Sequence, residues 1–278
     1  MPPLTRIGLL GCGSIGITIA ERLQRDPSIH ARLVCLFDQD RTRAERFKLK
    51  LSEDSCVATS FEEFLALPFD LLLECASQEA VRDCAEQALR AGKDLLIMSV
   101  GALMDEALCR RLFSVATEES KNLYFPSGAI GGLDLVRAAR EGRIYEVVLT
   151  TSKSPVALAG APYFQKTGTS PGDIHERKTL YEGPAKEAVE LFPSNVNVAA
   201  ALSLAGVGGQ KTIVKVVADP ELNVNVHEID VQGDFGTAKF TIRNLPHPKN
   251  PKTSYLAALS AIETLRRISL TKRGSPPG

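Results

Sequence analysis

The chain has 278 residues, enough to bury a sizeable core and to divide into two domains. Hydrophobic residues make up 44% and charged residues 24%, and 33 basic residues balance 33 acidic ones. This composition is typical of a soluble globular protein without a global field that attracts nucleic acid or an anionic membrane. No apolar run reaches the roughly 20 residues of a membrane-spanning helix, and residues 1–6 lack a signal-peptide pattern.

All six cysteines lie in the first half of the chain, and no two of them form a C-x-x-C pair. This usage is typical of free thiols in a reducing compartment and does not favour a metal site. We therefore expect a cytoplasmic protein that holds no metal.

The first predicted element is a short apolar strand, Ile7 to Leu10, followed by a glycine-rich turn and a helical pattern. The turn reads G-x-G-x-x-G between strand and helix, which is the context that indicates dinucleotide binding. Gly11 allows a sharp turn, Gly13 lets the backbone approach a pyrophosphate, and Gly16 lets the helix pack close to the strand. Free N–H groups at the helix N-terminus can donate hydrogen bonds to the phosphates. The predicted phosphate-binding residues are Gly11, Gly13, Ser14, Ile15 and Gly16.

A second strand, residues 31–37, ends at Asp38. An acid at this point suits a hydrogen bond to the adenosine ribose 2′-OH of NAD. Arg41 and Arg43 follow closely, and arginines accept the 2′-phosphate of NADP, so the choice between NAD and NADP stays open.

Strands and helices then alternate up to residue 125, which predicts a doubly wound parallel sheet of the Rossmann type. The expected strands are 56–58, 69–76, 93–98 and 122–125, and the expected helices are 41–51, 60–67, 78–91 and 105–120. Ligands of such sheets lie beyond the carboxyl ends of the strands. Ala76, Ser99 and Ala129 each follow the end of a predicted strand. These residues could line a cofactor cleft, or they could belong to ordinary tight turns between strand and helix.

The pattern changes after residue 126 to long strands, which predicts a second α/β (α+β) domain with a mixed or antiparallel sheet. The strands expected are 144–152, 211–218, 224–231 and 237–243, with helices at 184–191 and 196–205 and a loop or lid at 154–173. Asp234-Phe-Gly236 is typical of a hairpin turn. We expect domains at 1–125 and 126–248, and a C-terminal segment, 249–278, whose amphipathic helix 254–268 packs back on the first domain.

Of the four histidines, His227 is the candidate acid/base. It lies where one face of a strand changes from polar to apolar, and it has either a catalytic role or a hydrogen-bonded structural one. His30, His175 and His247 are expected at the surface. Ser194 or Asn195 could cap a helix that opens near Asn197, or Asn195 and Asn197 could instead present amides to a nicotinamide carboxamide. Lys252 and Thr253, at the start of the last helix, could hold a carboxylate or belong to an ordinary cap.

Six motifs together resemble the L-aspartate dehydrogenase family over residues 6–268. They are Gly-Cys-Gly-Ser-Ile-Gly, Ser-Val-Gly-Ala, Ser-Gly-Ala-Ile-Gly-Gly-Leu-Asp, Phe-Pro-Ser-Asn-Val-Asn-Val-Ala, Val-His-Glu-Ile with Gly-Asp-Phe-Gly, and Asn-Pro-Lys-Thr-Ser. The resemblance implies NAD(P)-dependent oxidation of L-aspartate to iminosuccinate, which hydrolyses to oxaloacetate and ammonia and also feeds NAD biosynthesis. It implies a homodimer, a catalytic role for His227, and cofactor contacts from Ala129 and Asn197. Lys153 and Lys252 are then candidate partners for the substrate carboxylates.

Two other functions stay open at this point. One is a dehydrogenase or reductase of another small amino or hydroxy acid, of the homoserine or dihydrodipicolinate type. The other is a non-catalytic dinucleotide sensor that uses its second domain for partner contacts.

Overall fold

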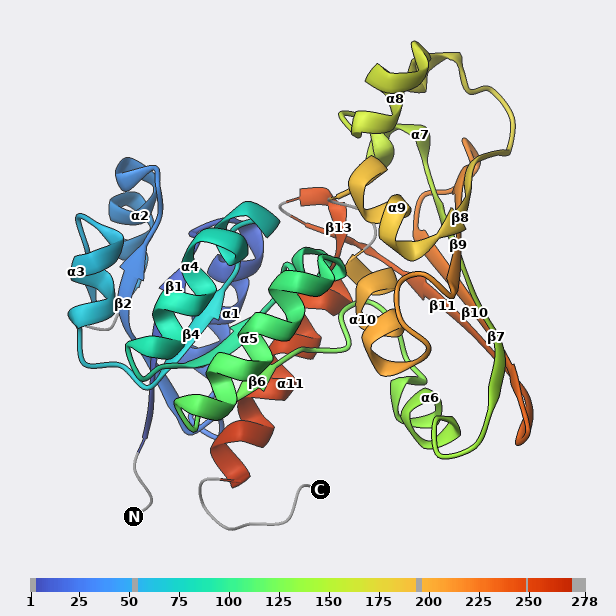
Figure 1. Cartoon of the computed structure of the whole chain (residues 1–278). Helices are drawn as coiled ribbons and strands as arrows, with labels where there is room; N and C mark the ends of the chain where they lie inside the picture. The colour runs from blue at the N-terminus through green and yellow to red at the C-terminus, as the bar shows by residue number, and fades with distance from the viewer. Residues whose placement is uncertain (1–3, 52–54, 194–196, 249, 272–278) are drawn as a thin grey trace. The chain divides into compact units, whose positions relative to one another are not determined.

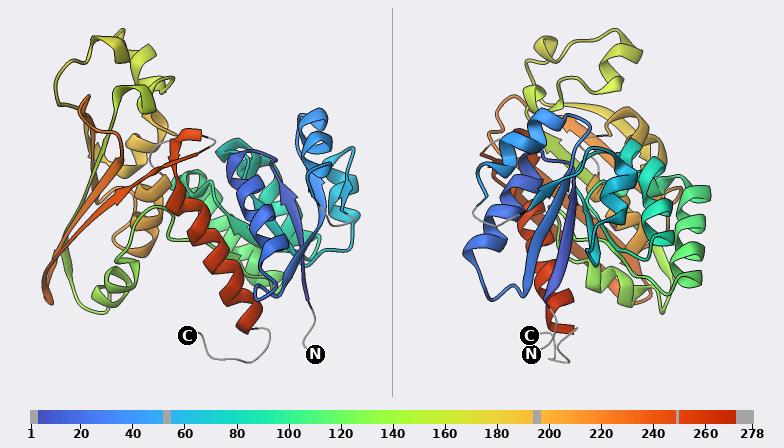
Figure 2. Two further views of the ribbon diagram at one scale, coloured as in Figure 1. Left: turned by 180° about the vertical axis from the view of Figure 1, so that it is seen from behind. Right: turned by 90° about the vertical axis from the view of Figure 1, so that its left-hand side faces the viewer.

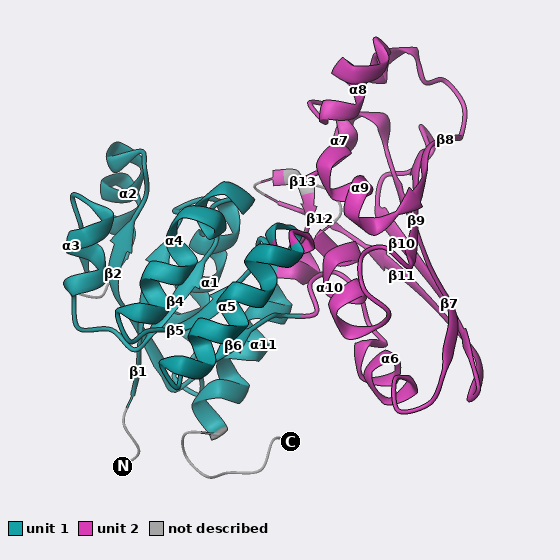
Figure 3. Ribbon diagram, viewed as in Figure 1, with its two compact units in different colours: residues 1–102, 106–126, 258–278 teal, residues 103–105, 127–257 magenta. Residues whose placement is uncertain are grey.

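The computed structural model describes residues 4–51, 55–193, 197–248 and 250–271. The chain divides into two compact units, coloured separately in Figure 3. The first unit comprises residues 1–102, 106–126 and 258–278, and the second comprises residues 103–105 and 127–257. No helix in the described part of the chain is long and apolar enough to cross a membrane.

The first unit contains a six-stranded parallel sheet with the order β3-β2-β1-β4-β5-β6. The strands are β1 (Thr5–Leu10), β2 (Ala31–Phe37), β3 (Cys56–Val57), β4 (Leu71–Glu74), β5 (Asp94–Ile97) and β6 (Leu123–Tyr124). The helices are α1 (Ser14–Arg25), α2 (Arg41–Lys48), α3 (Phe61–Ala66), α4 (Gln78–Arg90), α5 (Glu106–Glu118) and most of α11 (Tyr255–Thr271). Figure 1 shows α4 and α5 in front of this sheet, and the view from behind in Figure 2 shows α1 and α11 on its other face. The predicted doubly wound parallel sheet is therefore confirmed.

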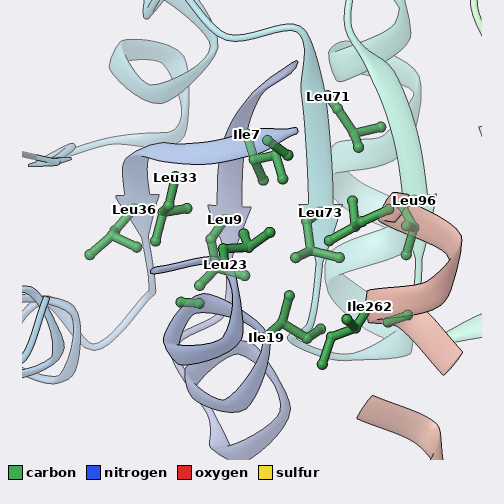
Figure 4. Close-up of a cluster of buried hydrophobic side chains, with 14 of the residues drawn as sticks. Ile7, Leu9, Ile19, Leu23, Leu33, Leu36, Leu71, Leu73, Leu96 and Ile262 are labelled. Carbon is green, nitrogen blue, oxygen red and sulfur yellow. The ribbon is translucent and has the colours of Figure 1, made fainter. Parts of the chain in front are cut away.

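Several helices of the first unit begin or end at the capping residues that the sequence predicts. Ser60 accepts a hydrogen bond from the Glu63 N–H at 3.0 Å, and Ser77 accepts one from the Ala80 N–H at 3.1 Å. Gly92, directly after α4, has a φ of +76°, a left-handed conformation that glycine adopts without a steric penalty. Apolar side chains of β1, β2, β4, α1 and α11 form one buried cluster, drawn in Figure 4.

The second unit contains a mixed five-stranded sheet with the order β11-β10-β7-β9-β8. The strands are β7 (Ile144–Lys153), β8 (Lys178–Pro184), β9 (Thr212–Ala218), β10 (Asn225–Gly233) and β11 (Gly236–Asn244). Only the β7–β9 pair is parallel among these described strands, and the Asp234–Gly236 hairpin joins β10 to β11 as predicted. The helices α6 (Leu133–Ala139), α9 (Ala185–Leu191) and α10 (Asn197–Ala205) lie together, and α9 and α10 pack on β9.

Two expectations for the second unit are wrong, and one strand was missed. Residues 154–173 are not a plain loop, because they form α7 (Pro155–Leu158), α8 (Pro162–Thr167) and a 3₁₀ turn at Pro171–Asp173. Strand β8 was not expected, since it is an edge strand without an alternating apolar pattern. His247 is not at the surface: it is 2% exposed in β12 (Pro246–His247), which pairs with β13 (Asn250–Ser254), and its ring packs edge-on against Tyr255.

Candidate functional site

The glycine turn between β1 and α1 has the geometry of a phosphate-binding loop. Gly11 has a φ of +95°, and a Cβ there would lie 2.7 Å from the backbone nitrogen of Ala76. A Cβ at Gly16 would lie 2.5 Å from the carbonyl oxygen of Gly11. A Cβ at Gly13, in contrast, would meet nothing within 4 Å. Close packing therefore requires glycine at positions 11 and 16. Gly13 faces open space, which a backbone segment needs if a pyrophosphate is to approach it.

A cavity of about 230 Å³ opens beside this turn, beyond the carboxyl ends of β1, β2 and β4. Its wall includes Gly11, Gly13, Asp38, Arg43, Ala76 and Ser77. Four predicted cofactor-binding residues thus lie around one cavity, at the place where doubly wound sheets bind dinucleotides. The described residues of this unit fit the adenosine and pyrophosphate portions of such a cofactor.

Asp38 is held rigidly at the edge of the cavity. Its carboxylate accepts hydrogen bonds from the Cys12 N–H at 2.8 Å and from the Asp40 N–H at 2.9 Å, and its side chain is only 8% exposed. The first of these bonds ties the acid to the glycine turn itself. The carboxylate therefore has a fixed position at the edge of the cavity.

Glu74 is a buried acid that sequence reasoning missed. It is 1% exposed and accepts hydrogen bonds from the backbone N–H groups of Ala76, Met98 and Ser99 and from the Ser99 hydroxyl, at 2.8–3.1 Å. Burial raises the pKa of Glu74, and these hydrogen bonds oppose the rise. The carboxyl group joins the ends of β4 and β5, and its partner Ser99 is 8% exposed, so the hydroxyl of this predicted cofactor contact is engaged inside the protein. A charged residue at the end of an otherwise apolar strand was the available signal.

The second unit carries a buried polar cluster at one end of its sheet. Residues two apart in a strand share a face, and on β10 the face changes from Val231 and Ile229 to His227 and Asn225. On β7 the corresponding face changes from apolar residues to Thr151 and Lys153. His227 pairs directly with Thr151 across the two strands. The four side chains of this polar cluster, Asn225, His227, Thr151 and Lys153, are each no more than 3% exposed.

His227 is held as a neutral imidazole in this polar cluster. Its Nδ1 lies 3.1 Å from the Thr151 hydroxyl oxygen. Burial, and then the positive charge of Lys153, lower the pKa of His227 to about 3, and burial alone lowers the pKa of Lys153 to about 8. A neutral proton acceptor therefore lies beside a buried cation.

Two amide side chains at this end of the sheet reach two other segments, one reaching β13 and the other the glycine-rich loop before α6. Asn225 donates a hydrogen bond to the Ser254 hydroxyl at 3.0 Å, and Asn244, its partner on β11, donates to the carbonyl oxygen of Ala129 at 2.8 Å. Gly128, with a φ of +67°, lies against Val198, which follows Asn197 at the start of α10. Ala129 and Asn197 thus belong to one connected region of the second unit.

The remaining predicted residues are less informative. Thr253 is half-buried in β13, whereas the side chain of Lys252 and residues Ser194 and Asn195 lie outside the part of the chain that the structure describes. Besides Glu74, Thr151 and Asn244 were not predicted to contribute to the site. The positions of Thr151 and Asn244 depend on strand pairing between distant segments, which no local pattern reveals.

Comparisons with known proteins agree with both units. Residues 11–126 match the family model described as homoserine dehydrogenase, NAD binding domain, and residues 134–268 match the one described as aspartate dehydrogenase, C-terminal. The chain is 48% identical to an L-aspartate dehydrogenase of Methanosarcina barkeri, over 95% of this chain and 97% of that protein. It is 42% identical to one of Nitrosopumilus maritimus, over 95% and 96% of the two chains. The crystal structure of aspartate dehydrogenase from Thermotoga maritima superposes with a TM-score of 0.73 at 28% identity, covering 95% of this chain and 96% of that one. The chain belongs to the L-aspartate dehydrogenase family, and its cofactor is NAD or NADP.

Proposed function

We propose that the chain oxidises L-aspartate to iminosuccinate, which hydrolyses to oxaloacetate and ammonia, with His227 as the acid/base. The observation that carries the proposal is the neutral, buried imidazole of His227 beside the buried ammonium of Lys153. An anionic amino acid needs a cation to hold it and a base to take its proton, and this cluster supplies both.

Different residues bind different portions of the cofactor. The open face of Gly13 and the N-terminus of α1 receive the pyrophosphate, and Asp38 binds the adenosine ribose. Ala129 and Asn197 contact the nicotinamide half, as the family resemblance implies. The bound nicotinamide supplies a hydride acceptor for the Cα hydrogen of aspartate.

His227 accepts the proton that the substrate ammonium group must lose before the Cα–N bond becomes an imine. The Thr151 hydroxyl lies 3.1 Å from Nδ1 of His227. In the tautomer that carries its proton on Nδ1, this N–H donates to the Thr151 hydroxyl, and Nε2 is then the proton acceptor. Substrate carboxylates beside Lys153 offset its charge and so raise the basicity of His227 as the substrate binds. His227 can also take a proton from the water that adds to the imine.

Lys153 binds one carboxylate of aspartate, and Lys252 with Thr253 binds the other. The two carboxylates of aspartate match two such positions, whereas homoserine has one carboxylate only. We therefore propose that charge recognition separates aspartate from homoserine and from hydroxy acids that carry a single carboxylate.

A substrate panel tests this function. Purified protein is mixed with NAD or NADP and either L-aspartate or L-homoserine, and separately with NADH or NADPH and dihydrodipicolinate, and the nicotinamide absorbance is followed. Only L-aspartate should give rapid cofactor reduction. Faster turnover of another compound contradicts the substrate assignment, and cofactor binding without any turnover supports a non-catalytic sensor.

We further propose a cytoplasmic homodimer whose iminosuccinate product supplies NAD biosynthesis. The family resemblance supports this context. Sedimentation equilibrium should give twice the chain mass of 30.0 kDa, and a monomer at micromolar concentration contradicts the dimer.

A further inference from the structure

Glu74, the last residue of β4, is a buried acid that the proposed chemistry does not use, and its hydrogen bonds divide between two turns. Its Oε1 accepts from the Ala76 N–H and from the Ser99 hydroxyl, each at 2.8 Å. Its Oε2 accepts from the Met98 N–H at 3.1 Å and from the Ser99 N–H at 2.9 Å. One carboxylate therefore ties the turn after β4 to the turn after β5.

The turn after β4 is part of the cofactor cavity. Ala76 and Ser77 line the cavity. A Cβ at Gly11 would lie 2.7 Å from the carbonyl carbon of Cys75 and from the nitrogen of Ala76, so the glycine turn packs directly on this peptide. The hydrogen bond from the Ala76 N–H to Glu74 therefore fixes a peptide that is both a wall of the cavity and the support of its phosphate-binding loop.

These two turns require a carboxylate rather than an amide at position 74. Each oxygen of Glu74 accepts a hydrogen bond from at least one backbone N–H, and a backbone N–H cannot reverse its polarity. A glutamine has one carbonyl oxygen, and its NH₂ group would face an N–H donor at the other position. In one orientation of that amide the Ala76 N–H loses its partner, and in the other the N–H groups of Met98 and Ser99 lose theirs.

We propose that Glu74 is a positioning residue of the cofactor pocket, whose carboxylate holds the turns after β4 and β5 in the conformation that receives the dinucleotide. Glu74 acts through Ala76 rather than by touching the cofactor, because it is 1% exposed and does not line the cavity. Without its hydrogen bonds the turn after β4 would have to become ordered when the cofactor binds, and this ordering lowers the affinity. The inference rests on the cofactor pocket of the proposed function and does not depend on the identity of the substrate.

Calorimetric titration of NADH into wild-type protein, Glu74→Gln and the matched control Asp94→Asn tests the proposal without a substrate. Asp94 is 9% exposed, accepts hydrogen bonds from Asn122, and lies at the amino end of β5, opposite the strand ends where the cavity opens. Glu74→Gln should weaken NADH binding roughly 10- to 100-fold, the range for the loss of one hydrogen bond to a charged group. Asp94→Asn makes the same acid-to-amide change away from the cavity and should leave the dissociation constant within about twofold.

Amide hydrogen exchange in the absence of cofactor provides a second readout, which needs no variant that folds. In the wild type, residues 75–78 should already exchange at least about 100-fold more slowly than an unstructured chain, because the turn is fixed before the cofactor binds. The same residues should exchange at least about tenfold faster in Glu74→Gln and at the wild-type rate in Asp94→Asn.

Three results would each overturn the proposal: normal NADH affinity in Glu74→Gln, equal weakening by Glu74→Gln and Asp94→Asn, or unprotected amides at residues 75–78 of the wild type. Wild-type protein that does not bind NADH would overturn it together with the cofactor pocket itself. Protein that binds NADH without oxidising aspartate would contradict the proposed function alone, since the titration and the exchange measurement contain no substrate.

Discussion

The residues around His227 set both its protonation state and the orientation of its ring. Burial and the nearby ammonium of Lys153 oppose its protonation, and Thr151 contacts its Nδ1. A hydroxyl at this position orients the ring without adding the negative charge that a carboxylate partner would bring. The orientation of the ring is therefore set separately from its basicity.

Replacing Thr151 with Val tests this orienting role. The substitution keeps the shape of the side chain and removes the hydrogen bond, so we expect kcat to fall about tenfold, the equivalent of one ordinary hydrogen bond. The KM for aspartate and the affinity for NADH should change little, and Thr151→Ser should restore kcat. A Val variant with normal kcat, or a Ser variant as slow as the Val variant, would contradict the role.

Stability should depend on pH through the same imidazole. The pKa of His227 is lowered to about 3 in the folded chain, whereas an unfolded histidine titrates near 6.5. Between these values the unfolded state binds more protons, so this contribution to stability is present above about pH 6.5 and is lost progressively as the pH falls towards 3.

Urea unfolding of wild-type protein and His227→Asn between pH 7 and pH 4 measures this contribution. The stability of the wild type should fall more steeply with acid than that of the variant, because the difference between the two curves isolates His227. Parallel curves would show that the imidazole titrates normally in the folded state.

At the level of elements, the β1–turn–α1 unit was predictable because its signals are local. Three glycines, an apolar strand and an amphipathic helix lie in one short stretch, and each glycine has a separate structural reason. The helices α7 and α8 were not predictable in this way. They are short, they begin at prolines, and their apolar residues become visible as buried only through tertiary contacts such as the stacking of Tyr163 on Phe192.

Substituting alanine at two of these glycines should separate packing from ligand binding. A Cβ at Gly16 must displace the Gly11 carbonyl, so Gly16→Ala should lower the unfolding free energy by at least about 1 kcal/mol. A Cβ at Gly13 meets nothing, so Gly13→Ala should unfold like the wild type and bind NADH at least tenfold more weakly. Thermal unfolding and calorimetric titration of both variants test these two predictions. Normal NADH binding by Gly13→Ala would contradict the proposal that the pyrophosphate binds at this turn.

For the whole molecule, the end of the chain completes the first unit. Ile262 of α11 lies in the same buried cluster as residues of β1 and β4 (Figure 4). Leu265, one turn of α11 further on, belongs to the same cluster. The amphipathic pattern of residues 254–268 made the helix itself predictable. The polar cluster of the second unit was predictable only in part: His227 and Lys153 are unusual side chains at strand ends, but the β7–β10 register that joins His227 to Thr151 is a property of the assembled sheet.

Leu265→Ala should destabilise the first unit although it lies far along the chain from the strands that it covers. Leu265 is 1% exposed, so its truncation should cost about 2–5 kcal/mol in the free energy of unfolding. Leu49→Ala is the matched control, because Leu49 is 86% exposed and its loss should cost less than about 0.5 kcal/mol. Urea unfolding compares the two variants, and equal costs would exclude α11 from the core.

The most direct test of the central claim compares turnover with cofactor binding in His227→Asn. If His227 moves the substrate proton, kcat for aspartate should fall about 10²- to 10⁴-fold, while calorimetry gives a dissociation constant for NADH within about twofold of the wild type. Turnover at the wild-type rate, or a loss of turnover matched by an equal loss of NADH affinity, would contradict the claim.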